Sequence, residues 1–107
     1  LLETYRNIED LDSRRDREVA DLDRTIHTLR ERETALLLQQ KELIERAAGY
    51  PEGRTPADLE DDIRSLDSEI VAQRSIIDAK MRERSAVLDR FEEDRKRYLI
   101  LSAPEGR

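Results

Sequence analysis

Apolar residues recur at alternating intervals of three and four positions along the first 48 residues of the chain. The best-kept row of this pattern contains Ile8, Leu22, Leu29, Leu36 and Leu43. Alternating steps of three and four give the period of a left-handed coiled coil, in which each helix turns a narrow apolar stripe towards its partner. The pattern therefore predicts one long coiled-coil helix over residues 1–48.

A second stretch of the same period follows a short segment rich in turn residues. Two of the three glycines and two of the three prolines lie within residues 49–56, and such residues end helices and favour turns. Beyond them the three-and-four spacing resumes with Leu59, Ile63, Leu66, Ile70 and Ile77. We expect a tip turn over residues 49–55, a second coiled-coil helix over 56–101 and a frayed tail over 102–107.

Two long helices joined by a short turn form an antiparallel hairpin. The predicted fold class is therefore all-α, an antiparallel two-helix coiled-coil hairpin that could assemble further into a four-helix bundle. A continuous parallel dimer is the structural alternative, but it would carry the glycine- and proline-rich break through its middle.

Polar residues inside the predicted interface offer a way to align the two helices, because a specific polar pair fixes the register of a coiled coil. Four residues are predicted to set the register: Glu33, Gln40, Gln73 and Lys80. An alignment in which paired residue numbers add to about 113 places Glu33 beside Lys80 and Gln40 beside Gln73.

An alternative alignment lies one heptad away, with paired residue numbers that add to about 106. It sets Asp12 against Asp94 and Ile26 against Lys80. Because like charges across an interface are unfavourable, the sequence favours the first alignment.

The composition fits this narrow architecture. Of the 107 residues, 43% are charged and only 36% are hydrophobic, too few for a compact domain of this length but enough for a two-helix interface. The net charge of −6 disfavours a nucleic-acid partner, because phosphate would be repelled. No apolar run approaches the roughly 20 residues needed to cross a membrane, so no membrane partner is expected.

The candidate chemistry is sparse, and we predict neither an enzyme, nor a cofactor, nor a metal site. The chain lacks cysteine, which leaves the compartment open, with an intracellular location as the default expectation. His27 is the only histidine, so an ordinary zinc site cannot form around it. The many carboxylates stand at helical spacing beside basic residues and are typical of surface ion pairs rather than of acid–base catalysis.

Two groups of apolar residues exceed what one two-helix interface can bury. The first, which we call the apolar flank residues, comprises Leu37, Leu38, Ile44, Val71 and Ile76. The second is the C-terminal apolar turn over residues 98–101, which includes Leu99 and Ile100, with Leu1, Leu2 and Tyr5 expected nearby. Extra apolar width on an amphipathic helix indicates a further helix, so these residues are the predicted partner interface.

The segment from Ile77 to Glu92 is loosely similar to the second helix of inhibitor-of-growth N-terminal domains, although the first helix is too long for that family. The hairpin also resembles Rho-effector finger domains and the arms of SMC- and Rad50-like ATPases, but Tyr50-Pro51-Glu52-Gly53 lacks the Cys-x-x-Cys of a zinc-hook tip.

We expect a non-enzymatic structural module of a larger protein. It would act as a spacer and as an oligomerisation or partner-docking surface. We expect a protein partner, either a second copy or a partner helix, in a dimer or a larger complex. Two other functions stay open: a regulatory hairpin that binds a small-GTPase-like partner, and an arm segment of an ATPase.

Overall fold

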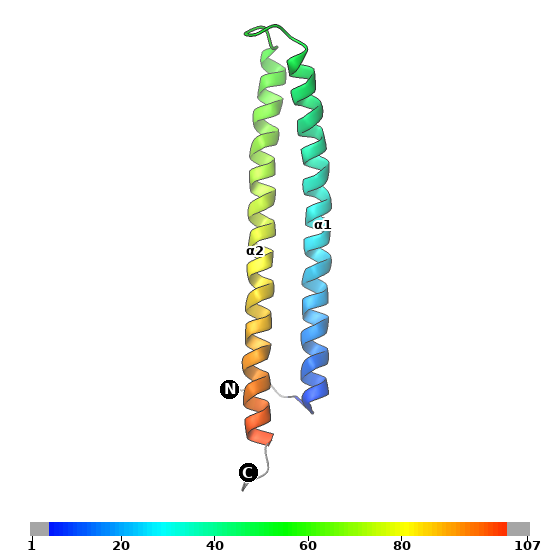
Figure 1. Cartoon of the computed structure of the whole chain (residues 1–107), viewed down its shortest axis with the longest axis vertical. Coiled ribbons are helices and arrows are strands. Elements are labelled where there is room, and N and C mark those ends of the chain that lie inside the picture. Colours follow the sequence, from blue (N-terminus) through cyan, green and yellow to red (C-terminus); the bar gives the residue numbers. More distant parts are fainter. Residues whose placement is uncertain (1–4, 103–107) are drawn as a thin grey trace. The chain divides into compact units, whose positions relative to one another are not determined.

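A computed structural model describes residues 5–102, and these residues form two long helices and no strand. Helix α1 spans Ile8–Ala48 and helix α2 spans Ala57–Ser102. The chain reverses between them (Figure 1). The predicted all-α antiparallel helical hairpin is therefore confirmed.

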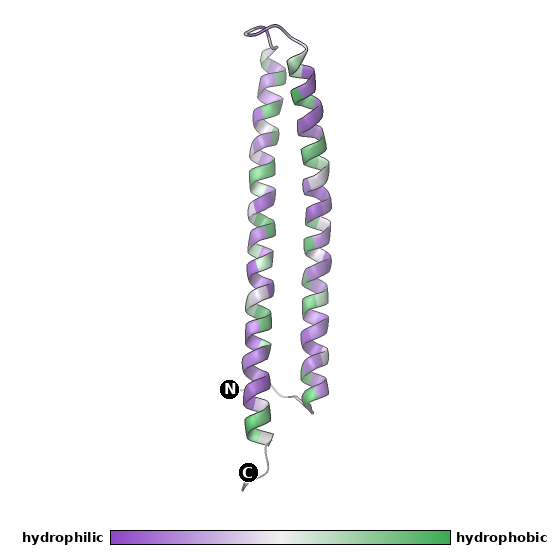
Figure 2. Cartoon of the chain, viewed as in Figure 1, coloured by the Kyte–Doolittle hydropathy of each residue, from purple (hydrophilic) through white to green (hydrophobic). Residues whose placement is uncertain are grey.

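The hairpin divides into two compact units, each containing a segment of both helices. Unit 1 comprises residues 1–25 and 80–107, and unit 2 comprises residues 26–79. Figure 2 shows apolar segments recurring between hydrophilic ones along both helices, as a coiled-coil spacing requires.

Unit 2 has an aliphatic core. Leu36, Leu66 and Ile70 form its buried cluster, and Leu37 and Leu43 pack against that cluster with part of their surface still exposed. Leu36, Leu43, Leu66 and Ile70 come from the predicted rows, and Leu37 is one of the apolar flank residues. Fully burying such a side chain stabilises a fold by about 1.5–3 kcal/mol, so a few of them account for most of the pairing of the helices in this unit.

Unit 1 has an aromatic core. Leu11, Val87 and Phe91 form its buried cluster, and the partly buried residues packed against it are Tyr5, Ile8, Val19, Leu22 and Tyr98. Asp94 is also buried, and the Tyr5 hydroxyl donates a hydrogen bond to its carboxylate at 3.0 Å. A buried carboxylate needs such a donor, because an unpartnered one would cost the core its desolvation energy.

Helix α1 begins later than the sequence predicted. Residues 5–7 precede the helix, and residues 1–4 of the predicted helix lie outside the described part of the chain. Asn7 accepts a hydrogen bond from the Asp10 amide at 2.8 Å, and the Asp10 carboxylate accepts one from the Arg6 amide at 3.2 Å. The Asn7 side chain thus caps the helix that begins at Ile8, which the apolar spacing alone did not reveal.

The tip contains a tight turn that reverses the chain. The Arg54 amide donates to the Pro51 carbonyl at 2.9 Å, and Gly53 has a φ of 74°. A positive φ at the third residue of a four-residue turn defines a type II turn, which favours glycine there. Helix α2 then starts at Ala57, within one residue of its predicted boundary, as the Pro56 carbonyl accepts from the Glu60 amide at 3.1 Å.

Candidate interaction surfaces

Six of the seven predicted partner-interface residues are exposed on the described chain. Their exposed fractions run from 47% for Ile76 to 73% for Ile100. The six are Leu38, Ile44, Val71, Ile76, Leu99 and Ile100. These six side chains lie outside the buried clusters of the hairpin and are accessible to another protein.

Leu37 differs from the other six. It is half-buried and packs against the cluster of Leu36, Leu66 and Ile70 in unit 2. Leu37 therefore lies at the edge of the two-helix core and exposes less of its surface than the other six. It follows Leu36 directly on α1, and a side chain one position along the helix can still cover the edge of a narrow core.

The exposed flank residues do not lie along one stripe. At about 100° per residue, Leu38 stands roughly 200° around α1 from buried Leu36, and Ile44 stands roughly 80° from it. On α2, Val71 directly follows buried Ile70, whereas Ile76 directly precedes a second buried residue, Ile77. Adjacent positions before and after one buried row point to opposite sides of it. Unit 2 therefore exposes several small apolar patches.

The C-terminal apolar turn lies in the last turns of α2. Leu99, Ile100 and Leu101 are consecutive and all exposed, while Tyr98 packs against the core of unit 1. At about 100° per residue, three consecutive positions span about 200° of the helix circumference. Leu1 and Leu2, which were expected to join this group, lie outside the described residues.

The predicted pairing of Glu33 with Lys80 is wrong. Arg74 donates to the Glu33 carboxylate at 2.9 Å, and Lys80 instead binds Glu83 on its own helix at 3.1 Å. Glu33 therefore has a cross-helix partner of opposite charge, but that partner lies six positions nearer the tip than Lys80.

The predicted pairing of Gln40 with Gln73 is also wrong. The Gln40 side-chain amide donates to Asp67 at 2.7 Å, and the Gln73 side-chain amide donates to the Leu29 carbonyl at 2.9 Å. Both glutamines still make cross-helix bonds. They contribute to alignment through different partners.

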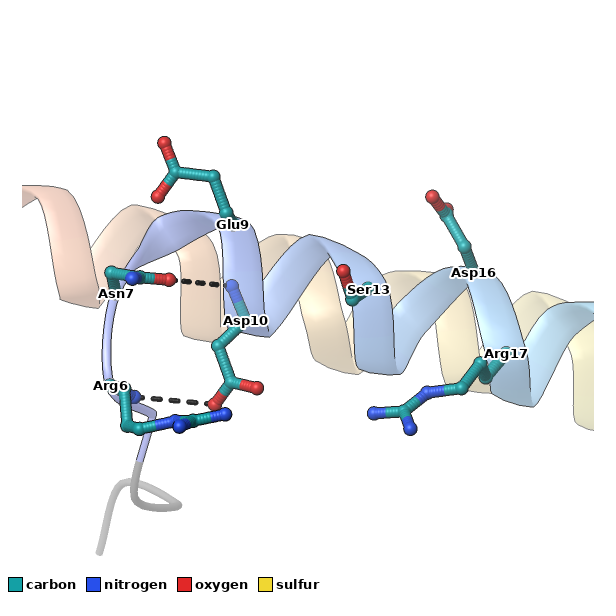
Figure 3. Close-up of a pocket in the computed structure, with 7 residues that line it drawn as sticks. All are labelled: Arg6, Asn7, Glu9, Asp10, Ser13, Asp16 and Arg17. Atoms are coloured by element: carbon teal, nitrogen blue, oxygen red, sulfur yellow. Dashed lines mark hydrogen bonds between the residues drawn. The ribbon is translucent and has the colours of Figure 1, made fainter.

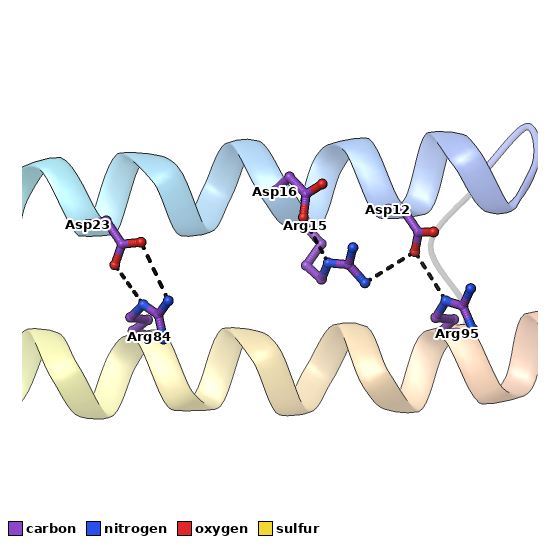
Figure 4. A network of polar contacts seen from close by, with 6 residues as sticks. All are labelled: Asp12, Arg15, Asp16, Asp23, Arg84 and Arg95. Carbon is purple, nitrogen blue, oxygen red and sulfur yellow. Dashed lines mark hydrogen bonds and ion pairs between the residues drawn. The ribbon is translucent and has the colours of Figure 1, made fainter.

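The observed alignment is close to the alternative that the sequence disfavoured. Paired residue numbers add to 107 in four cross-helix contacts: Glu33–Arg74 and Gln40–Asp67 in unit 2, and Asp12–Arg95 and Asp23–Arg84 in unit 1. The two contacts in unit 1 appear in Figure 4.

The objection to this alignment was the approach of Asp12 to Asp94, and the structure provides separate partners for each carboxylate. Arg15 and Arg95 bind Asp12 at 3.3 and 3.2 Å, so two guanidinium groups surround it (Figure 4). Asp94 accepts from Tyr5. The sequence argument set the two carboxylates against each other and did not pair them with the arginines and the tyrosine nearby.

An open hollow lies at the start of α1 (Figure 3). Its lining residues all come from one short stretch of the chain: Arg6, Asn7, Glu9, Asp10, Ser13, Asp16 and Arg17. Acidic and basic groups alternate there, and Asp10 is already used in capping the helix. One side of one helix cannot surround a substrate with converging groups, as catalysis requires.

A groove between the helices lies in unit 2. Gln39, Glu42 and Leu43 line it from α1, and Asp62, Ser65, Leu66 and Glu69 line it from α2. Leu43 and Leu66 belong to the core of the unit and form an apolar floor. Glu69 is paired with Arg32 at 2.7 Å. Within residues 5–102, no ion-pair partner is seen for Glu42 or Asp62.

His27 is exposed, and its Nε2 lies 3.2 Å from Glu31 one turn along the helix. No group of three or more histidine, aspartate or glutamate residues in the described part of the chain is arranged to hold a metal ion. Neither helix, over its described residues, is long and apolar enough to cross a membrane.

Comparison of the chain with protein-family models, with curated proteins and with solved structures finds no match.

Proposed function

We propose that this hairpin is a non-enzymatic structural module of a larger protein, which binds other protein surfaces through apolar side chains on the outer faces of its helices. The observation that carries the proposal is the exposure of Leu38, Ile44, Val71 and Ile76 in unit 2. The core of that unit is already complete without them. About half or more of the surface of each remains open to a partner.

The energetic gain from covering these residues is large enough for specific association. Burying one such side chain contributes about 1.5–3 kcal/mol before the cost of association is subtracted. Because the patches lie on more than one side of unit 2, several partner helices could pack around it. A bundle of two hairpins is the simplest arrangement of this kind.

A pair of substitutions on α2 tests the proposal. Val71→Glu with Ile76→Glu should weaken concentration-dependent association in sedimentation velocity. Helicity should be retained, because glutamate is a good helix former at exposed positions. The matched control is Ala72→Glu with Ser75→Glu, which adds the same charge at exposed positions of the same helix and should leave association unchanged.

The proposal would be contradicted by a chain that stays monomeric at high concentration while the Val71→Glu/Ile76→Glu variant leaves the assembly of the parent protein intact. Circular dichroism of each variant separates loss of binding from loss of folding.

A further inference from the structure

The C-terminal apolar turn stands next to a run of basic residues. Arg95, Lys96 and Arg97 directly precede it. Arg95 binds Asp12, but Lys96 and Arg97 are exposed, and within residues 5–102 no ion-pair partner is seen for either. The last turns of α2 therefore present two free cations followed by three exposed apolar side chains.

The groove of unit 2 has complementary chemistry. Glu42 and Asp62, which have no ion-pair partner within residues 5–102, come from opposite helices and line the groove together with Leu43 and Leu66. The whole unit is acidic, because residues 26–79 hold 12 of the 26 acidic residues and only 7 of the 20 basic ones. Unit 2 therefore has a net charge of −5, and the rest of the chain contributes only −1 of the total of −6.

We infer that the groove of unit 2 binds the C-terminal apolar turn of a second copy of this chain. In this contact Lys96 and Arg97 lie against Glu42 and Asp62, while an apolar side chain of the turn covers the floor. The inference rests on the proposed function, binding to other proteins, and names a second copy of this chain as the partner. Because the two surfaces differ, one copy uses its turn and the other its groove, which is a heterologous contact.

Charge complementarity selects this occupant over an unrelated apolar surface. Opposite charges at the edge of a small apolar contact speed association and penalise wrong partners. A partner without cations would leave Glu42 and Asp62 facing apolar surface without compensation. The contact should also weaken as salt is raised, since exposed charges are screened.

Reversing the charges on each surface gives a decisive test. The groove variant is Glu42→Lys with Asp62→Lys, and the turn variant is Lys96→Glu with Arg97→Glu. Each variant alone should self-associate at least about tenfold more weakly than the native chain at low salt. An equimolar mixture of the two should associate again, because each then meets opposite charge on the other.

The matched control is Glu45→Lys with Glu60→Lys, which makes the same charge change in unit 2 away from the groove. It should associate like the native chain, and a separate Ile100→Ser variant should lose association without any change of charge. Circular dichroism checks that all variants stay helical.

Two outcomes would overturn the inference. In the first, both reversal variants associate normally while Val71→Glu/Ile76→Glu does not, so the proposed function stands and the groove contact fails. In the second, the turn variant loses binding to anionic lipid vesicles but the groove variant has no effect on self-association, so the basic turn serves a membrane surface. A native chain that never self-associates also rejects the inference. The proposed function is then tested by whether Val71→Glu/Ile76→Glu disturbs the assembly of the parent protein.

Discussion

The two units use the same coiled-coil spacing but stabilise the pairing of their helices differently. Unit 2 is closed by the tip turn and has a core of leucine and isoleucine. Unit 1 has Phe91 and two tyrosines in or against its core, and it buries Asp94 beside them. Both units make polar contacts across the helices, but among the described residues the buried carboxylate, Asp94, belongs to unit 1.

The separation of the contacts along the chain explains the difference. Gln40 and Asp67 in unit 2 are 27 positions apart, whereas Asp12 and Arg95 in unit 1 are 83 positions apart. Closing a loop of 83 positions costs about 1 kcal/mol more in chain entropy than closing a loop of 27 positions. Unit 2 can therefore form from local contacts, while unit 1 gains from specific contacts that select the right alignment of distant segments.

The largest expected effect comes from removing the main aromatic side chain of unit 1. Phe91 is 2% exposed, so Phe91→Ala should cost about 3–5 kcal/mol. We expect hydrogen exchange to rise across the described residues of unit 1 while unit 2 keeps its protection, because unit 2 closes through its own turn.

The matched change in unit 2 is Leu36→Ala, with an expected cost of about 2–5 kcal/mol. Leu36→Ala should raise hydrogen exchange in both units. When unit 2 opens, the two helix segments of unit 1 are joined by a longer unfolded loop, so closing unit 1 costs more chain entropy. Equal loss of protection in both units after Phe91→Ala would show that they do not unfold separately.

A smaller effect tests the buried polar contact of unit 1. Tyr5→Phe removes the hydroxyl that donates to Asp94 and leaves a buried carboxylate without that donor, at a cost of about 1–3 kcal/mol. Combining Tyr5→Phe with Asp94→Leu should restore stability or exceed it, because no buried charge then remains. Urea unfolding measures both variants.

Tyr98→Phe is the control, because Tyr98 packs against the same cluster and no hydrogen bond of its hydroxyl is seen within residues 5–102. Its expected effect is within about 0.5 kcal/mol. A cost for Tyr98→Phe equal to that of Tyr5→Phe would remove the argument for a specific Tyr5–Asp94 contact.

The sequence predicted what depends on periodic spacing and missed what depends on individual side chains. The reversal near residues 49–55 and the rows that contain Leu36, Leu66 and Ile70 follow from a repeat that any amphipathic helix must obey. The start of α1 was missed because Asn7 and Asp10 cap the helix within an apolar pattern that continues before them.

The alignment of the helices was the main error, and it has a physical origin. A heptad shift keeps every apolar residue in the interface, so apolar spacing cannot distinguish the two alignments. The choice depends on long side chains that reach across the interface edge, such as Arg74 and Arg95. Their partners become visible only when the helices are placed side by side. Exposure of the flank residues followed from spacing, but the partial burial of Leu37 did not.

The tip turn gives a prediction for the closure of unit 2. Gly53 has a φ of 74°, a conformation that costs an L-residue about 1–2 kcal/mol, so Gly53→Ala should destabilise the hairpin by that amount. Gly49 has no positive φ, and an added Cβ would meet only the Arg46 carbonyl at 3.3 Å. Gly49→Ala should therefore cost clearly less in thermal unfolding, and equal costs would contradict the assignment of the turn.

The smallest expected effect distinguishes the two alignments directly. Arg74 and Glu33 form a cross-helix ion pair at 2.9 Å, with the Arg74 side chain 56% exposed, so solvent screens the attraction. A double-mutant cycle between them should give a coupling of about 0.2–1 kcal/mol. The same cycle between Glu33 and Lys80 should give none, because Lys80 binds Glu83. Coupling in the second cycle but not the first would restore the alignment that the sequence favoured. Coupling in the first alone would show that the arginines beside the core, rather than the polar residues within it, fix the register of unit 2.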